Sequence, residues 1–224
     1  MIYLSGIISL CIQLLVGVID YLALKVKLKP EDELLKDLLQ VELYVQVVEF
    51  LFYICLIYFF HQVSNVTPYR YLDWAITTPL MLITLSAFLN HEGKSTSPRL
   101  RNFLFTHSAA VMKIISLNAA MLFFGFIGEM GYLNVYLSTA LGFLPFLLNF
   151  KYIKDTFLPS RPGGEDKYKN RLFNWFVFFW GLYGVCAVMS YTYKNTGYNI
   201  LDIFSKNFFG LFLAYTVWQK VKEL

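Results

Sequence analysis

The chain has 224 residues, of which 57% are hydrophobic and 15% are charged, and its mean hydropathy is +0.52. Soluble domains carry about 25% charged residues, so this composition excludes an ordinary soluble domain and indicates an integral membrane protein with several spans. The net charge of +4 comes from linkers between apolar segments and does not indicate a nucleic-acid partner. The three cysteines lie inside apolar segments without metal-ligand spacing, so we expect no metal site.

Seven apolar segments of about 20 residues or more follow one another, and each can cross a hydrocarbon core of roughly 30 Å. The expected spans are Ile2–Leu24, Leu34–Phe60, Tyr69–Leu89, Phe103–Ile127, Tyr132–Tyr152, Leu172–Tyr191 and Tyr198–Val217. A GEMG turn is expected after the fourth span, and a KNTG turn before the seventh. The sequence therefore predicts an all-α membrane protein, with residues 1–224 forming one bundle of seven transmembrane helices.

Basic residues gather in alternate linkers, and Lys194 is the exception. The segments that follow the odd-numbered spans contain Lys25, Lys27, Lys29, Lys36, Lys94, Arg99, Arg101, Lys151, Lys154, Arg161, Lys167, Lys169, Arg171, Lys220 and Lys222. Because cytoplasmic loops carry an excess of Lys and Arg, this pattern predicts an extracellular N-terminus and a cytoplasmic C-terminus.

Polar residues form a stripe along the first two spans. Glu42, Gln46, Glu49 and Tyr53 are spaced by four, three and four residues, which puts them on one helix face. Ser9 and Gln13 share a face of the first span by the same spacing. A stripe of carboxylates and amides inside a bundle indicates a hydrated cation path, and the alternative is a polar network that bridges helices.

Charged residues also occur within the third and seventh spans. Arg70, Asp73 and Thr77 share one face of the third span. Lys206 lies near the middle of the seventh span, and Asp202 lies one turn before it. Two interpretations remain open at this point: a plain buried ion pair, or a lysine that carries a covalent cofactor as a Schiff base. In either case Asp73 and Asp202 can flank one buried cation, with Arg70 balancing the two acids.

Two motifs carry a resemblance to a known family. The run R-Y-x-D-W-x-x-T-T-P-L, which begins at Arg70, resembles the third helix of the microbial (type 1) rhodopsins. The pair Asp202 and Lys206, as D-x-x-x-K, resembles their retinal-binding helix. The short chain and the glutamates of the second span resemble the viral rhodopsins, which include light-gated cation channels.

The resemblance implies a site for all-trans-retinal. It assigns Lys206 to the Schiff base, Asp73 and Asp202 to the counterions, and Arg70 to their extracellular side. It assigns to the retinal pocket Tyr53, Trp74, Thr77, Thr78, Met81, Asn118, Met121, Gly125, Ser138, Thr139, Trp180 and Tyr183. The chain departs from the family at Gly184, where proline is usual, and at Ala187, where a second aromatic residue is common.

Further departures concern the direction of transport. Outward proton pumps of this family usually have a carboxylate eleven residues after the first counterion, and Thr84 occupies that position. The outer end of the seventh span also lacks the usual release glutamates. We therefore expect a light-gated cation channel whose path includes Ser9, Glu42, Glu49 and Asn207. The alternative is an outward proton pump in which Glu42 is the cytoplasmic proton donor.

The expected partners are the lipid bilayer and monovalent cations or protons, and homo-oligomerisation is left open. We do not expect an enzyme. Lys113, inside the fourth span, either extends to the cytoplasmic surface or pairs with an acid of the path.

Overall fold

The computed structural model describes residues 1–91, 99–158 and 166–222, so Lys94 and Arg161 of the topology argument lie outside the described residues. Its helical elements are α1 (Ile2–Leu24), the 3-10 turn η1 (Pro30–Asp32), α2 (Glu33–Phe59), α3 (Thr67–Asn90), α4 (Leu100–Thr106), α5 (Ser108–Glu129), α6 (Val135–Phe157), α7 (Lys167–Ala187), α8 (Tyr191–Asp202), the π-helical turn η2 (Ile203–Asn207) and α9 (Phe208–Lys222). No strand occurs within these described ranges.

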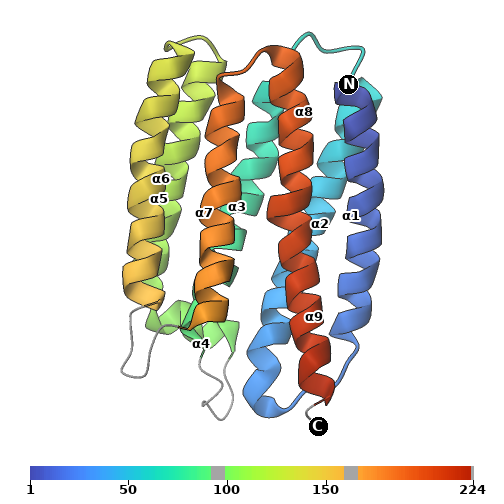
Figure 1. Cartoon of the computed structure of the whole chain (residues 1–224), viewed down its shortest axis with the longest axis vertical. Helices are drawn as coiled ribbons and strands as arrows, with labels where there is room; N and C mark the ends of the chain where they lie inside the picture. The colour runs from blue at the N-terminus through green and yellow to red at the C-terminus, as the bar shows by residue number, and fades with distance from the viewer. Residues whose placement is uncertain (92–98, 159–165, 223–224) are drawn as a thin grey trace.

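Within the described ranges, the predicted spans correspond to α1, α2, α3, α5, α6, α7 and the continuous rod α8–η2–α9. They stand side by side as a bundle (Figure 1). Five of these rods are long and apolar enough to cross a membrane by hydropathy alone, and α6 and α7 are not among the five. Both of these helices include charged residues at the end where we expect the cytoplasm, among them Lys154 in α6 and Lys167 in α7. The predicted all-α, multi-pass membrane fold is confirmed.

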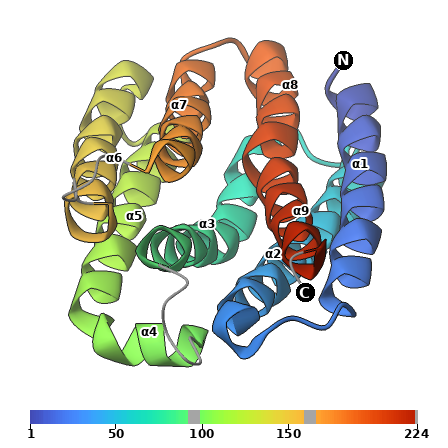
Figure 2. The same cartoon turned by 60° about the horizontal axis from the view of Figure 1, so that its bottom comes forward.

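Two predicted boundaries are wrong. The fourth span does not run unbroken from Phe103, because α4 ends at Thr106 and α5 begins at Ser108. Figure 2 shows α4 lying across the end of the bundle. It is held there by Asp37 of α2, which accepts hydrogen bonds from Arg99 Nε and the backbone N–H of Leu100, each at 2.9 Å.

The expected KNTG turn is also wrong, because residues 194–197 are helical within α8. The chain turns earlier, after α7 ends at Ala187. Gly197 serves close packing instead of a turn: a Cβ built on it would lie 2.6 Å from Cys186 Sγ. Sequence patterns treat glycine as a turn signal, whereas here it lets α8 approach α7. The GEMG turn, by contrast, does form, with Gly131 at φ +78°.

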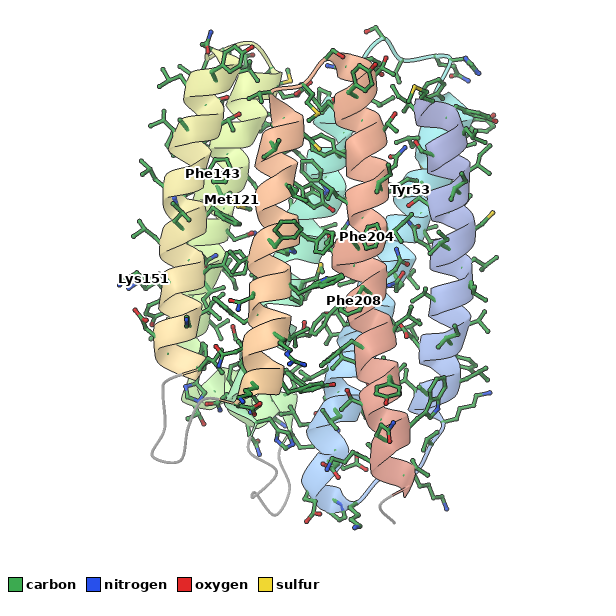
Figure 3. All side chains as sticks on the ribbon, in the orientation of Figure 1. Tyr53, Met121, Phe143, Lys151, Phe204 and Phe208 are labelled. Atoms are coloured by element: carbon green, nitrogen blue, oxygen red, sulfur yellow. The ribbon has the colours of Figure 1, made fainter. Side chains whose placement is uncertain are left out.

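One group of buried polar residues lies between α1, α2 and the last rod, α8–η2–α9. α1 packs against α2, α8 and α9, and these faces carry Ser9, Gln13, Glu42 and Glu49, all buried. The main apolar core contains Met81, Phe146, Phe150 and other side chains of α3, α5, α6 and α7, and it continues through apolar side chains of α2 and α9 such as Leu38 and Phe209. Many large apolar side chains are exposed on the outside of the bundle, where lipid covers them, and the exposed Lys151 points outward from α6 (Figure 3).

Candidate functional site

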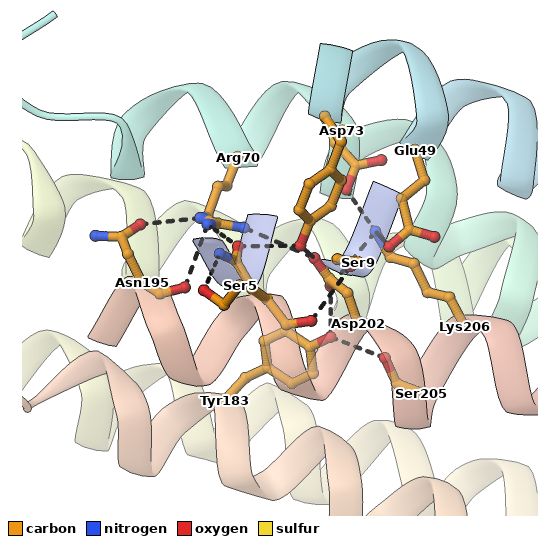
Figure 4. A network of polar contacts seen from close by, with 12 residues as sticks. Ser5, Ser9, Glu49, Arg70, Asp73, Tyr183, Asn195, Asp202, Ser205 and Lys206 are labelled. Carbon is orange, nitrogen blue, oxygen red and sulfur yellow. Dashed lines mark hydrogen bonds and ion pairs between the residues drawn. The ribbon is translucent and has the colours of Figure 1, made fainter. Parts of the chain in front are cut away.

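Lys206 meets three carboxylates at the centre of the bundle. Its Nζ lies 2.5 Å from Asp73 Oδ2, 3.6 Å from Asp202 Oδ1 and 3.6 Å from Glu49 Oε1. These acids come from α3, α8 and α2, and all four side chains are buried (Figure 4). The two aspartates flank the amine as predicted. Glu49, which the sequence placed only in the path, is the unexpected third neighbour.

Two phenols fix the orientation of Asp202. Tyr53 donates to Asp202 Oδ2 at 2.7 Å, and Tyr183 donates to Oδ1 at 2.6 Å. Tyr183 also lies 2.8 Å from Ser205 Oγ. Each oxygen of this buried carboxylate therefore has a donor from another helix, which satisfies it more completely than Asp73, whose Oδ1 has none.

Arg70 is 0% exposed and connects Asp202 to a group of amides on α8. Its Nη1 lies 3.7 Å from Asp202 Oδ2, its Nε donates to Asn195 Oδ1 at 3.0 Å, and its Nη2 donates to Asn199 Oδ1 at 2.5 Å. Asn195 in turn donates to Thr67 Oγ1 at 2.9 Å. Sequence reasoning missed Asn195, because the wrong turn assignment placed it in a loop.

The backbone around Lys206 departs from the α-helix. Residues Ile203–Asn207 form a π-helical turn between α8 and α9. Asn207 Nδ2 reaches back to the carbonyl oxygen of Asp202 at 3.4 Å. Such bulges occur mostly as single turns and often at functional sites, since they widen the helix and turn a side chain to a new direction.

A cavity lies between α3, α5, α6 and α7, and Lys206 is among the residues that line it. Predicted pocket residues that line it are Trp74, Thr78, Met81, Met121, Gly125, Ser138, Thr139, Trp180 and Tyr183. At two wall positions a larger residue would displace a neighbouring ring: a Cβ on Gly125 would lie 2.7 Å from Tyr71 Oη, and a Cβ on Gly184 would lie 2.5 Å from the Phe143 ring.

Three predicted pocket residues lie behind the wall of the cavity. Thr77 is buried and donates to the backbone oxygen of Asp73 at 2.9 Å. Asn118 donates to Thr78 Oγ1 at 2.8 Å, which links α5 to α3. Tyr53 lies on the opposite side, against Asp202. Asn118 therefore supports a residue that lines the cavity, whereas Thr77 and Tyr53 contact the two aspartates beside Lys206.

The predicted polar stripe faces inward between α1, α2 and the last rod. Ser9 Oγ contacts the backbone oxygen of Asn199 at 3.4 Å, and Gln13 donates to Ser9 at 3.2 Å. Glu42 Oε1 accepts from Thr84 Oγ1 at 2.5 Å. Several other polar atoms of this region have no hydrogen-bond partner among the described residues: Gln13 Oε1, Glu42 Oε2, both amide atoms of Gln46, both carboxylate oxygens of Glu49 and Asn207 Oδ1.

Sequence reasoning missed Asp20, which lies on the same face of α1 as Ser9 and Gln13 and is 0% exposed. Its signal was present in the sequence, since a single charge within an apolar span is a functional candidate by default. Lys113, by contrast, is exposed on α5 and lies 4.0 Å from the centre of the Tyr152 ring. It therefore makes a cation–π contact away from the stripe.

The comparisons with known proteins agree with this geometry. The sequence profile of the bacteriorhodopsin-like proteins matches residues 5–220, so the chain belongs to this family of retinal-binding membrane proteins. It is a microbial rhodopsin similar to the viral rhodopsins. The crystal structure of viral rhodopsin OLPVRII matches with a TM-score of 0.84 and 28% identity, covering 97% of this chain and 98% of that one.

More distant relatives share the fold. A blue light-absorbing proteorhodopsin from Med12 matches with a TM-score of 0.71 and 22% identity over 100% of this chain and 98% of that one. Xanthorhodopsin, described as a light-driven ion pump with dual chromophore, matches with a TM-score of 0.75 and 17% identity over 99% and 94%. No curated protein sequence matches the chain.

Membership in the family makes all-trans-retinal the cofactor and supports light-dependent ion transport as the general function. The residues of this chain suit retinal. The cavity is lined mainly by apolar and aromatic side chains, and Lys206 is one of its lining residues. Asp73 Oδ1 is a buried acceptor without a hydrogen-bond partner, beside the amine that would carry the cofactor.

Proposed function

We propose that this chain is a light-gated cation channel, with residues 1–224 acting as one retinal-binding transmembrane domain whose N-terminus is extracellular. Lys206 Nζ holds retinal covalently as a protonated Schiff base. Asp73 and Asp202 are the counterions, and Arg70 balances their charge on the extracellular side. When bound, retinal supplies the absorption of light and a change of shape on isomerisation. The remaining roles belong to the side chains of the protein.

The charges around Lys206 favour one protonated carboxyl. Three acids face two cations, Lys206 and Arg70, so full ionisation would leave one buried negative charge unbalanced. Asp202 receives two phenol hydrogen bonds, and Asp73 is the nearest acid to the amine. Glu49 receives no hydrogen bond on either oxygen. We therefore assign the extra proton to Glu49, which can hold it in the dark and release it when the charge beside it moves.

The observation that carries the channel proposal is the column of unpaired buried polar atoms between α1, α2 and the last rod. Gln46, Glu49 and Asn207 all contribute atoms to it, and Ser9 lies at its outer part. Buried polar groups are normally paired, so a column of unpaired ones suits a route that water and cations enter on opening. Glu49 joins this column to Lys206, which connects the cofactor site directly with the path.

One contact favours the second candidate, an outward proton pump. Glu42 Oε1 accepts a hydrogen bond from Thr84, and Thr84 occupies the α3 position where pumps of this family usually carry their donor. Glu42 is therefore at the right place on the bundle to return a proton toward Lys206 from the cytoplasm. In a pump, the unpaired buried polar atoms between α1, α2 and the last rod would transfer protons and would not form a path for larger cations.

Whole-cell recording under light separates the two functions. Channel function predicts a light-induced current that reverses with the cation gradient, whereas pump function predicts outward current at every voltage. Glu42→Gln and Glu49→Gln are expected to reduce or alter the channel current without loss of colour. Wild-type permeation in both coloured variants would contradict the proposed path. Leu14→Gln, at an exposed position on the lipid face of α1, is a matched control for adding an amide elsewhere.

A further inference from the structure

Asp20 is a buried carboxylate that the proposed path does not yet use. It is 0% exposed, and neither of its oxygens has a hydrogen-bond partner among the described residues. No ion pair with Asp20 occurs in that part of the chain either. A carboxylate in the interior of a membrane protein is costly unless something balances it, so Asp20 needs a proton or a cation.

The register of α1 against the last rod places Asp20 on the cytoplasmic side of Lys206. Ser9 of α1 contacts Asn199 of α8. Asp20 lies 11 residues after Ser9, Gly210 of α9 lies 11 residues after Asn199, and these two residues again lie against each other. The two helices lie side by side over this length (Figure 1). A Cβ on Gly210 would lie only 2.3 Å from Asp20 Oδ2, so the carboxylate fits here because residue 210 is glycine.

A second carboxylate and an amide face the same region from α2. Glu42 lies on α2, which packs against both α1 and α9; it is 0% exposed, and its Oε2 has no hydrogen-bond partner among the described residues. Gln46 lies one turn further along the same face of α2, is 2% exposed, and has both amide atoms unpaired. Three free carboxylate oxygens and an unpaired buried amide thus gather between α1, α2 and α9.

From this arrangement we propose that Asp20 and Glu42 form the cytoplasmic cation site of the path, a place where a permeating monovalent cation is held weakly between α1, α2 and α9. This inference rests on the proposed channel function. Two carboxylates and one amide supply fewer oxygen ligands than the about six to eight that Ca²⁺ takes, so we expect the site to hold a monovalent cation weakly. Weak binding is what conduction requires, because the ion must also leave.

The test measures the outward photocurrent as the cytoplasmic Na⁺ concentration is varied. Asp20→Asn keeps the shape and removes the charge. It is expected to raise the half-saturating Na⁺ concentration about tenfold, the size of one charge–charge contact in a partly hydrated site. Gly210→Ala, which forces the Asp20 carboxylate away from α9, is also expected to raise the half-saturating Na⁺ concentration. Gly17→Ala is the matched control, since a Cβ there meets no atom within 4 Å.

The outcomes separate this inference from the channel proposal itself. If the wild type gives no light-induced current that reverses with the cation gradient, the channel proposal is refuted, and this site with it. If the wild type conducts and Asp20→Asn keeps the wild-type half-saturation, the site alone is refuted. The visible colour of each purified variant checks folding. Should Asp20→Asn yield no coloured protein, an unchanged half-saturation in coloured Gly210→Ala refutes the site.

Discussion

Replacing Glu49 by glutamine tests the charge assignment around Lys206. If Glu49 were ionised, its oxygen at 3.6 Å from Lys206 Nζ would stabilise the cation by about 5 kcal/mol at an effective dielectric constant of 20. Removing that charge would change the absorption spectrum. If Glu49 is protonated, as we propose, glutamine replaces one neutral group by another of the same shape. The electrostatic stabilisation of the cation on Lys206 then changes little.

We therefore expect Glu49→Gln, reconstituted with all-trans-retinal, to keep the wild-type absorption maximum while its photocurrent changes. Asp73→Asn is the matched comparison, because Asp73 lies 2.5 Å from the amine and its removal costs the cation about 7 kcal/mol by the same reasoning. That variant is expected to show a shifted spectrum. A shift in Glu49→Gln as large as the one in Asp73→Asn would refute the assignment of the proton to Glu49.

Three further predictions concern the cofactor and stability. Lys206→Ala is expected to give folded but colourless protein after addition of retinal, as checked by visible absorption; a retinal spectrum in this variant would contradict covalent attachment there. Gly125→Val places a branched side chain where even a Cβ would lie only 2.7 Å from Tyr71 Oη, so retinal uptake measured by absorbance should fall. Lys194→Met leaves Glu129 without its partner at 2.8 Å, and both side chains are nearly buried. The substitution should destabilise the protein by about 3 kcal/mol, seen as loss of colour at a lower temperature. If the colour is lost at the wild-type temperature, the ion pair is well solvated and this reasoning is refuted.

Several features followed from the sequence alone, because they depend on local pattern. Hydropathy and charge asymmetry gave the spans, and the boundaries of α1 agree with the prediction at both ends. The helix period put Arg70 and Asp73 on one face and Asp202 one turn before Lys206. Two such motifs in the expected spans were enough to indicate the family, since each shows where a buried charge must be balanced.

Other features required the tertiary structure, because a helix period gives the inward face but not the neighbour that meets it. The sequence could not show that Glu49 of α2 comes within ion-pair distance of Lys206, or that Asp20 rests on Gly210. The sequence pattern also predicted a turn at Gly197. In the structure this glycine lies inside α8, where close packing against Cys186 favours a small residue. Distances between side chains on different helices depend on how the helices are rotated and shifted against one another. These rotations and shifts are determined by how the complete surfaces of several helices pack together, and the sequence of any one helix does not contain that information.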